Sequence, residues 1–257
     1  MDITNLDTYN TRMASSIEDK MWFWDKVKYT TNSIVDYGCA DGSLLLRINE
    51  EHPRQTLIGY DASDDMLARA KEKTKDTPIC FVESIFEPEM ERTCLILSSV
   101  VHEIYSYQSK EDADFELGML FDLGAKYIAI RDMGVQDICH SMETPVDVLK
   151  RIYERDDIVK IASFEKHQGR ISNWVNCIHY LLKAPYDENW AREVEENYIP
   201  FTMNEVLAQY NMNSPVKYDI VYFEAYTLPY VRERIIRDYK IALYVPTHYK
   251  LLLERRI

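Results

Sequence analysis

Short apolar runs recur along the chain, and the stretches between them carry apolar residues at intervals of three and four positions. Such runs are typical of buried parallel strands, and such intervals are typical of amphipathic helices. The alternation predicts an α/β fold with a mostly parallel sheet and helices on both of its faces. The expected strands are residues 34–35, 56–60, 78–82, 94–101, 127–130, 218–226 and 248–254.

The connection between the fifth and sixth expected strands, residues 133–216, is far longer than a usual connection. Amphipathic patterns at 146–153 and 174–182 indicate helices within it. Glu205 follows Thr202 by three residues, which is the spacing of a capping box. We therefore expect a helical cap inserted between strands five and six, over the sheet edge where open α/β sheets bind ligands.

Two smaller helical additions are expected at other points of the chain. Residues 227–246 predict a helical insertion between strands six and seven. Residues 1–29 precede the first strand, and their apolar spacing from residue 8 onward predicts a covering helix with Tyr9, Arg12 and Lys20 as polar candidates.

The connection after the first strand combines glycines with acidic residues, in the pattern Asp36-x-Gly38-x-Ala40-x-Gly42. Glycine allows a tight turn and a close approach of the backbone to a ligand. Asp61 ends the second strand 19 residues after Gly42, where nucleotide-binding folds place a carboxylate on the ribose hydroxyls. The glycine spacing differs from that of dinucleotide sites, and the acidic residues would repel a pyrophosphate but suit an ammonium or sulfonium group.

The segment Val-Asp-Tyr-Gly-Cys-Ala-Asp-Gly resembles the first motif of class I S-adenosylmethionine-dependent methyltransferases, usually Asp-x-Gly-x-Gly-x-Gly, and Asp61 matches the acidic residue that holds the ribose. The resemblance implies one methyltransferase domain over residues 1–257, with a Rossmann-like seven-stranded sheet of order 3-2-1-4-5-7-6 and strand seven antiparallel. It implies S-adenosylmethionine as the cofactor and S-adenosylhomocysteine (SAH) as the product. Ala40 departs from the motif, standing where the family usually has its middle glycine, and we expect binding to persist if φ at Ala40 is negative.

The same resemblance, together with the strand ends, yields the candidate cofactor-binding residues. Glu83 and Ser84 follow the third strand, where the family often contacts the adenine amino group. The full set is Asp36, Gly38, Cys39, Ala40, Gly42, Asp61, Ala62, Glu83, Ser84, Ser98 and Ser99.

The segment that leaves the fourth strand carries the catalytic candidates His102 and Glu103. In this fold family that strand end borders both the cofactor and the acceptor, and many small-molecule methyltransferases have a histidine there. Methyl transfer from a sulfonium requires a positioned acceptor and, for a hydroxyl or ammonium, removal of its proton. Histidine suits a base at neutral pH, whereas a positioning or packing role suffices for acceptors that need no deprotonation.

Arg131 ends the fifth strand at the same sheet edge. It is predicted either to bind an acidic or polar acceptor or to pair with Asp132 and fasten the cap. The other candidates for acceptor binding are Tyr105, Tyr226 and Tyr230, with His248 also near the pocket. The remaining histidines have no ligand-like spacing with carboxylates or cysteines, so no metal site is expected.

The net charge of −13 disfavours non-specific binding to nucleic acid or anionic membranes, and no apolar run reaches 18 residues, so no membrane association is expected. The five cysteines are scattered and odd in number, which favours a reducing, cytoplasmic setting; Cys80 and Cys94 lie in apolar runs and are expected to be buried.

Three functions remain open at this point. The first is methylation of a small or medium-sized acceptor in a capped pocket. The second is RNA methylation, because residues 228–257 carry a net charge of +4 and tyrosines that could stack on bases. The third is a non-catalytic, cofactor-binding scaffold protein, against which the intact ligand-ready turn argues. The identity of the acceptor and the oligomeric state stay open.

Overall fold

A seven-stranded sheet forms the centre of the computed structural model, which describes residues 16–84, 90–212 and 215–256. The strand order is β3-β2-β1-β4-β5-β7-β6, with β7 antiparallel to both of its neighbours, as predicted. The strands are β1 (Ser33–Tyr37), β2 (Thr56–Tyr60), β3 (Cys80–Val82), β4 (Thr93–Ser98), β5 (Tyr127–Met133), β6 (Tyr218–Tyr226) and β7 (His248–Arg255). Tyr9 and Arg12 of the expected N-terminal helix lie outside the described residues.

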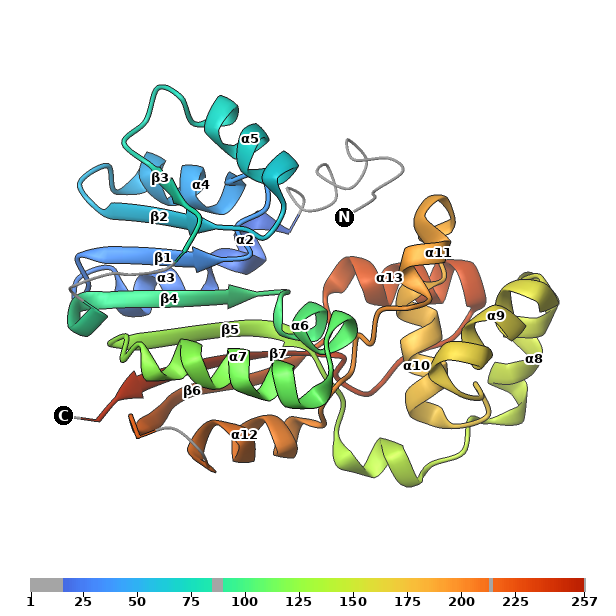
Figure 1. Cartoon of the computed structure of the whole chain (residues 1–257). Helices are drawn as coiled ribbons and strands as arrows, with labels where there is room; N and C mark the ends of the chain where they lie inside the picture. Colours follow the sequence, from blue (N-terminus) through green and yellow to red (C-terminus); the bar gives the residue numbers. More distant parts are fainter. Residues whose placement is uncertain (1–15, 85–89, 213–214, 257) are drawn as a thin grey trace.

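Helices cover both faces of this sheet (Figure 1). The central strand β4 is buried along its whole length, and its side chains alternate between two cores, Cys94 and Ile96 in one and Leu95 and Leu97 in the other. The first core includes α2 (Ile17–Lys20), η1 (Met21–Phe23), α3 (Trp24–Val27), α4 (Ser43–Glu51) and α5 (Asp64–Lys73). The second includes α6 (Val101–Tyr107), α7 (Lys110–Asp122) and α12 (Met203–Met212), while η2 (Met90–Arg92) precedes β4.

A helical lobe lies beyond the carboxyl ends of β1, β4 and β5 (Figure 1). It consists of η3 (Asp137–Ser141), α8 (Val146–Arg155), α9 (Ile158–Gln168), α10 (Trp174–Lys183), η4 (Asp187–Asn189), α11 (Trp190–Glu193) and α13 (Pro229–Tyr239). These elements share one apolar core. The segment after β5 and the segment after β6, which the sequence presents as two separate insertions, therefore pack together as one body.

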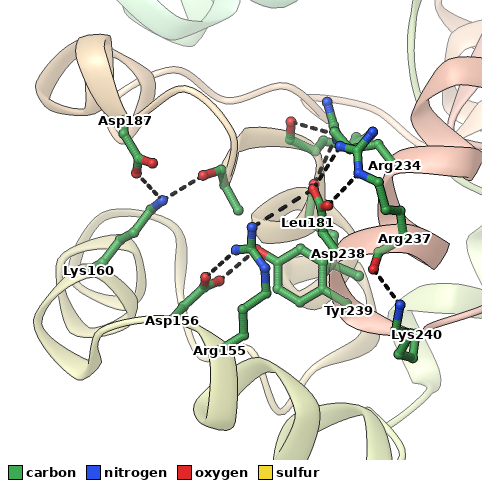
Figure 2. Close-up of polar contacts among 12 residues, drawn as sticks. Arg155, Asp156, Lys160, Leu181, Asp187, Arg234, Arg237, Asp238, Tyr239 and Lys240 are labelled. Atoms are coloured by element: carbon green, nitrogen blue, oxygen red, sulfur yellow. Dashed lines mark hydrogen bonds and ion pairs between the residues drawn. The ribbon is translucent and has the colours of Figure 1, made fainter.

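Polar contacts across the lobe join α8 to α13 (Figure 2). The Asp156 carboxylate, just after α8, accepts hydrogen bonds from Arg155 at 2.6 Å and from the Tyr239 hydroxyl at 2.6 Å. Arg234 on α13 donates to the carbonyl of Leu181 near the end of α10, where unpaired carbonyls favour a cation. The lobe is thus held by side-chain hydrogen bonds as well as by apolar packing.

Helix α12 belongs to the sheet and not to the lobe, although it lies within residues 133–216. Met203 and Val206 pack in the second core of the sheet. The capping box is confirmed, because the Thr202 hydroxyl accepts from the Glu205 amide and the Glu205 carboxylate accepts from the Thr202 amide. Ser63 likewise caps α5 through the amide of Met66.

Cysteine burial follows the prediction at one position and departs from it at another. Cys94 is buried on central β4, whereas Cys80 is exposed, because β3 is the edge strand of the sheet. No helix in the described part of the chain is long and apolar enough to cross a membrane.

Candidate functional site

Asp61 is held at the carboxyl end of β2 by backbone hydrogen bonds. Its Oδ2 accepts from the Ala40 amide at 2.8 Å, and its Oδ1 accepts from the Ser63 amide at 2.9 Å. The amides of Gly38 and Cys39 donate to the Tyr60 carbonyl, which ties the turn after β1 to the end of β2. A cavity of about 350 Å³ lies beside this carboxylate. Its walls include Tyr37, Gly38, Tyr60, Asp61, Ala62, Val100, Glu103, Tyr107 and Gln108.

The turn contains three residues with positive φ, namely Gly38 at 78°, Ala40 at 48° and Gly42 at 72°. The condition of a negative φ at Ala40, on which the expectation of binding rested, is therefore not met. A side chain in this left-handed region costs about 1–2 kcal/mol, because Cβ crowds the backbone. At Gly38 an added Cβ would also lie 2.8 Å from a methyl carbon of Val100, so glycine is required there for space as well as conformation.

We expect Ala40→Gly to raise the free energy of unfolding, because glycine relieves the left-handed strain at φ 48°. The gain is about 1 kcal/mol once the greater entropy of glycine in the unfolded chain is subtracted. For a domain of this size that corresponds to a rise of about 2–4 °C in melting temperature, measured by calorimetry. A lower melting temperature would show that the alanine methyl contributes packing that outweighs the strain.

A second cavity lies on the other side of Gly38, between the turn and α2. Its lining consists of Ile17, Lys20, Asp36, Gly38, Cys39, Ala40, Asp41, Ser43, Leu44 and Ser98. Burial raises the pKa of Asp36 to about 7, although the nearby Lys20 ammonium opposes the shift. Burial also lowers the pKa of Lys20 to about 8, with Arg131 adding to the shift and Asp36 opposing it. The cavity therefore offers one acidic and one basic group in close electrostatic contact.

Ser98 and Asp41 also line this second cavity. The Ser98 hydroxyl is buried and has no hydrogen-bond partner among the residues that the structure describes. Asp41, expected with Asp36 to suit a cationic ligand, is already engaged: it accepts from the amide and hydroxyl of Ser43 and pairs with Lys73 at 2.7 Å. Asp36 is therefore the better placed of the two carboxylates for a cationic group.

The third cavity, of about 140 Å³, lies between the sheet edge and the lobe. His102 forms part of its wall, and the His102 Nδ1 lies 2.7 Å from Oδ1 of Asp132 on β5. The other Asp132 oxygen accepts from the His102 amide at 3.1 Å. Burial disfavours the imidazolium, but the Asp132 carboxylate outweighs burial and raises the pKa of His102 to about 9. At neutral pH the pair is therefore an imidazolium–carboxylate ion pair.

Arg131 also lines the third cavity, but it does not pair with Asp132 as the cap-fastening prediction has it. Its Nε lies 2.5 Å from Asp19 on α2, and its NH1 donates to the Ser99 hydroxyl at 2.8 Å. Neighbouring residues on a strand point to opposite faces, so Arg131 and Asp132 take separate partners. Asp19 also accepts a hydrogen bond from the Tyr226 hydroxyl. Tyr226 therefore contacts the carboxylate that pairs with Arg131.

The lobe contributes the opposite wall of the third cavity, through residues that the sequence did not single out. They are Tyr186, Asn189, Arg192, Glu193, Glu196 and Tyr198. Arg192 reaches both Glu196 at 2.6 Å and Glu103 on α6 at 3.2 Å. Glu103 is thus bound to the lobe, whereas His102 pairs with Asp132.

The three cavities adjoin one another through shared lining residues. Gly38 borders the first and second, Lys20 borders the second and third, and Glu103 borders the first and third. Tyr230 and His248 line the third cavity, as expected. The site is therefore a group of three neighbouring cavities around the carboxyl end of β1.

Other predicted residues lie elsewhere. The Tyr105 hydroxyl donates to Asp114 on α7 and its ring packs on Phe201, so Tyr105 is outside the cavity linings described above. Glu83 and Ser84 follow β3 at the surface, and their adenine contact stays a prediction. Across residues 16–84, 90–212 and 215–256, no group of three His, Cys, Asp or Glu side chains is arranged to hold a metal ion.

The fold is that of class I S-adenosylmethionine-dependent methyltransferases. The plantazolicin methyltransferase BpumL, solved with a triazolic desmethylPZN analog and SAH, has a TM-score of 0.54 at 13% identity, over 99% of this chain and 88% of its own. Its counterpart BamL gives 0.52 at 12% identity, over 97% and 87%. A methyltransferase from Anabaena variabilis gives 0.50 at 12% identity, over 100% and 96%. No protein-family model and no curated protein matches the sequence.

Proposed function

We propose that this protein is an S-adenosylmethionine-dependent methyltransferase that acts on a small or medium-sized acceptor enclosed by the helical lobe. The observation that carries the proposal is that three cavities with shared lining residues adjoin one another at the carboxyl end of β1. The first two adjoin the motif residues Asp36 and Asp61, and the third extends under the lobe. Such an arrangement provides a donor half and an acceptor half that meet at one strand end.

The residues present fit the cofactor at both of its ends. Each Asp61 oxygen accepts one backbone amide, which leaves further acceptor capacity for the two ribose hydroxyls. Lys20 and Asp36 offer one charge of each sign to an amino-acid zwitterion, and the buried Ser98 hydroxyl would gain the hydrogen-bond partner that it lacks among the described residues. When bound there, the cofactor supplies an electrophilic methyl group on its sulfonium.

His102 positions the acceptor in this proposal. Because Asp132 raises its pKa to about 9 against the opposing effect of burial, the imidazole is protonated at neutral pH, and its Nε2–H is available to a polar atom of the acceptor other than the atom that is methylated. It becomes a base as the pH approaches 9. The lobe wall excludes water from the same cavity and so favours transfer to the acceptor over hydrolysis.

The RNA alternative is weakened only in part, because several of the seven basic C-terminal residues contact other groups of the protein whereas Arg232 and Arg237 stay exposed. Lys250 pairs with Asp19 at 2.7 Å, Arg255 donates to the Gly124 carbonyl at 3.0 Å, and Arg256 pairs with Asp219. Phosphate binding needs cations that are available to solvent. The net charge of −13 acts in the same direction.

Titration calorimetry of the purified protein with SAH tests the proposal, and we expect a dissociation constant in the micromolar range. An absence of binding would overturn it. A methylation screen against metabolite and RNA pools then separates the alternatives. RNA that is retained by the purified protein in a salt-dependent manner would indicate an RNA methyltransferase. Binding of SAH with no turnover in either pool would favour a non-catalytic scaffold.

A further inference from the structure

The lobe wall of the third cavity is built around a buried lysine. Lys183 on α10 is fully buried, and its ammonium donates to the backbone carbonyls of Glu193 and Glu196. The same ammonium lies 4.0 Å from the centre of the Tyr198 ring. These contacts fix the backbone of residues 193–198, so the two glutamates are held in place against the cavity.

Glu193 has carboxylate capacity that the protein does not use. Its side chain is only 6% exposed and lines the cavity. One oxygen accepts from the Tyr198 hydroxyl, and the other has no hydrogen-bond or ion-pair partner within the described ranges. Because Glu193 lines the cavity, this oxygen is suited to accept a hydrogen bond from a ligand.

The cations of the same cavity are, by contrast, already matched with carboxylates. Arg131 pairs with Asp19, and His102 pairs with Asp132. Lys20 has Asp36 as its electrostatic partner. The Arg192 guanidinium lies between Glu103 and Glu196, and the buried Lys183 is electrostatically coupled to Glu193 and Glu196. Each of these cations therefore has a carboxylate partner, whereas Glu193 keeps one oxygen without a hydrogen bond among the described residues.

On this basis, and resting on the proposed function, we infer that the acceptor is an amine, whose ammonium form is recognised by Glu193. The aromatic residues Tyr186 and Tyr230 also line the cavity, and aromatic rings attract cations. An anionic acceptor would meet Glu193 and Glu196 across the cavity without an unmatched cation to hold it.

The proposed reaction has two steps, a proton transfer and then a methyl transfer. The bound ammonium gives one proton to the Glu193 carboxylate, whose pKa is raised by burial and by the nearby Glu196. The exposed nitrogen lone pair then forms the new N–C bond while the S–C bond breaks and its electron pair returns to sulfur. The products are a methylated ammonium ion and a neutral thioether, and Glu193 later releases its proton to solvent.

Matched probe pairs test this inference on the full chain saturated with SAH. The pairs are benzylamine with benzoate, phenethylamine with phenylacetate, and 3-phenylpropylamine with 3-phenylpropanoate, which differ mainly in charge. We expect ligand-observed NMR to show at least a tenfold preference for the amine of one or more pairs. Equal binding within every pair, tighter carboxylate binding, or no amine binding would overturn the inference.

Variants of Glu193 link that preference to the residue. Glu193→Gln is expected to weaken amine binding at least tenfold, whereas Glu195→Gln leaves it unchanged, because Glu195 is exposed and its side chain has no contact with the described residues. Tyr198→Phe keeps the carboxylate but removes the hydroxyl that orients it, so the preference should persist with a severalfold weaker affinity. Unchanged amine binding in Glu193→Gln would contradict the assignment.

SAH calorimetry on the same samples separates two kinds of failure. Normal SAH binding without amine preference refutes the acceptor class alone. Loss of SAH binding by the wild-type protein refutes the proposed function itself.

Discussion

Asp61→Ala should abolish measurable SAH binding, with an affinity at least a hundredfold below that of the wild-type protein. The carboxylate is positioned by two backbone amides and lines the first cavity, so under the proposed function its remaining acceptor capacity would serve the ribose hydroxyls. Hydrogen bonds to a charged group contribute about 1.5–3 kcal/mol each, and the loss of two such bonds exceeds the roughly 2.7 kcal/mol that a hundredfold change requires. Titration calorimetry measures both affinities directly.

Two companion variants separate ligand contact from a change in the turn. Asp61→Asn keeps one carbonyl oxygen for the backbone but removes the charge, and it should bind with intermediate affinity. Asp65→Ala removes an exposed carboxylate from the first turn of α5, with no contact to the described residues, and it should bind like the wild-type protein. An Asp61→Ala variant that folds normally and binds SAH with unchanged affinity would show that Asp61 serves the turn alone.

The donor half of the site could be predicted because its chemistry is local. Asp36, Gly38 and Gly42 lie within seven residues, and Asp61 ends the next strand, so one βαβ unit brings them together. The conformation of Ala40 was left open in this half, because a negative φ was only the condition for expecting binding. A position that the resembled family fills with glycine is itself a signal for positive φ, and it indicated the left-handed turn that the structure has.

The acceptor half could not be predicted in the same way, because its parts are distant in sequence. Glu193 and Tyr198 lie in a polar stretch that reads like any solvated helix, and only the packing of the lobe brings them against His102. The partner of His102, by contrast, could have been inferred from the sequence. Alternation of side chains along β5 separates Arg131 from Asp132, and that rule alone leaves Asp132 available for another group.

Asp132→Asn should lower the free energy of unfolding by about 3–5 kcal/mol, because removing one partner of a buried ion pair leaves the other charge uncompensated. Both side chains are almost fully buried, and the carboxylate holds the backbone as well as the ring of His102. For a domain of this size the expected fall in melting temperature is roughly 6–20 °C. Calorimetry across a pH series gives both the size of the loss and its pH dependence.

The pH dependence identifies the ion pair as the cause. Asp132 raises the pKa of His102 to about 9 despite burial, so the stability from this shift is complete below the ordinary value of 6.5 and is lost as the pH rises through 9. His102 and hydrogen bonds lower the pKa of Asp132 despite burial, and that contribution is lost as the pH falls below about 4. The difference between wild type and Asp132→Asn should therefore be largest between about pH 4 and 6.5 and should shrink towards pH 9 and beyond.

Asp76→Asn, at an exposed position with no contact to the described residues, should show no such profile. A loss that is equally large at every pH would mean that Asp132 acts through neutral hydrogen bonds, and His102 would then be uncharged in the cavity and able to serve as a base at neutral pH.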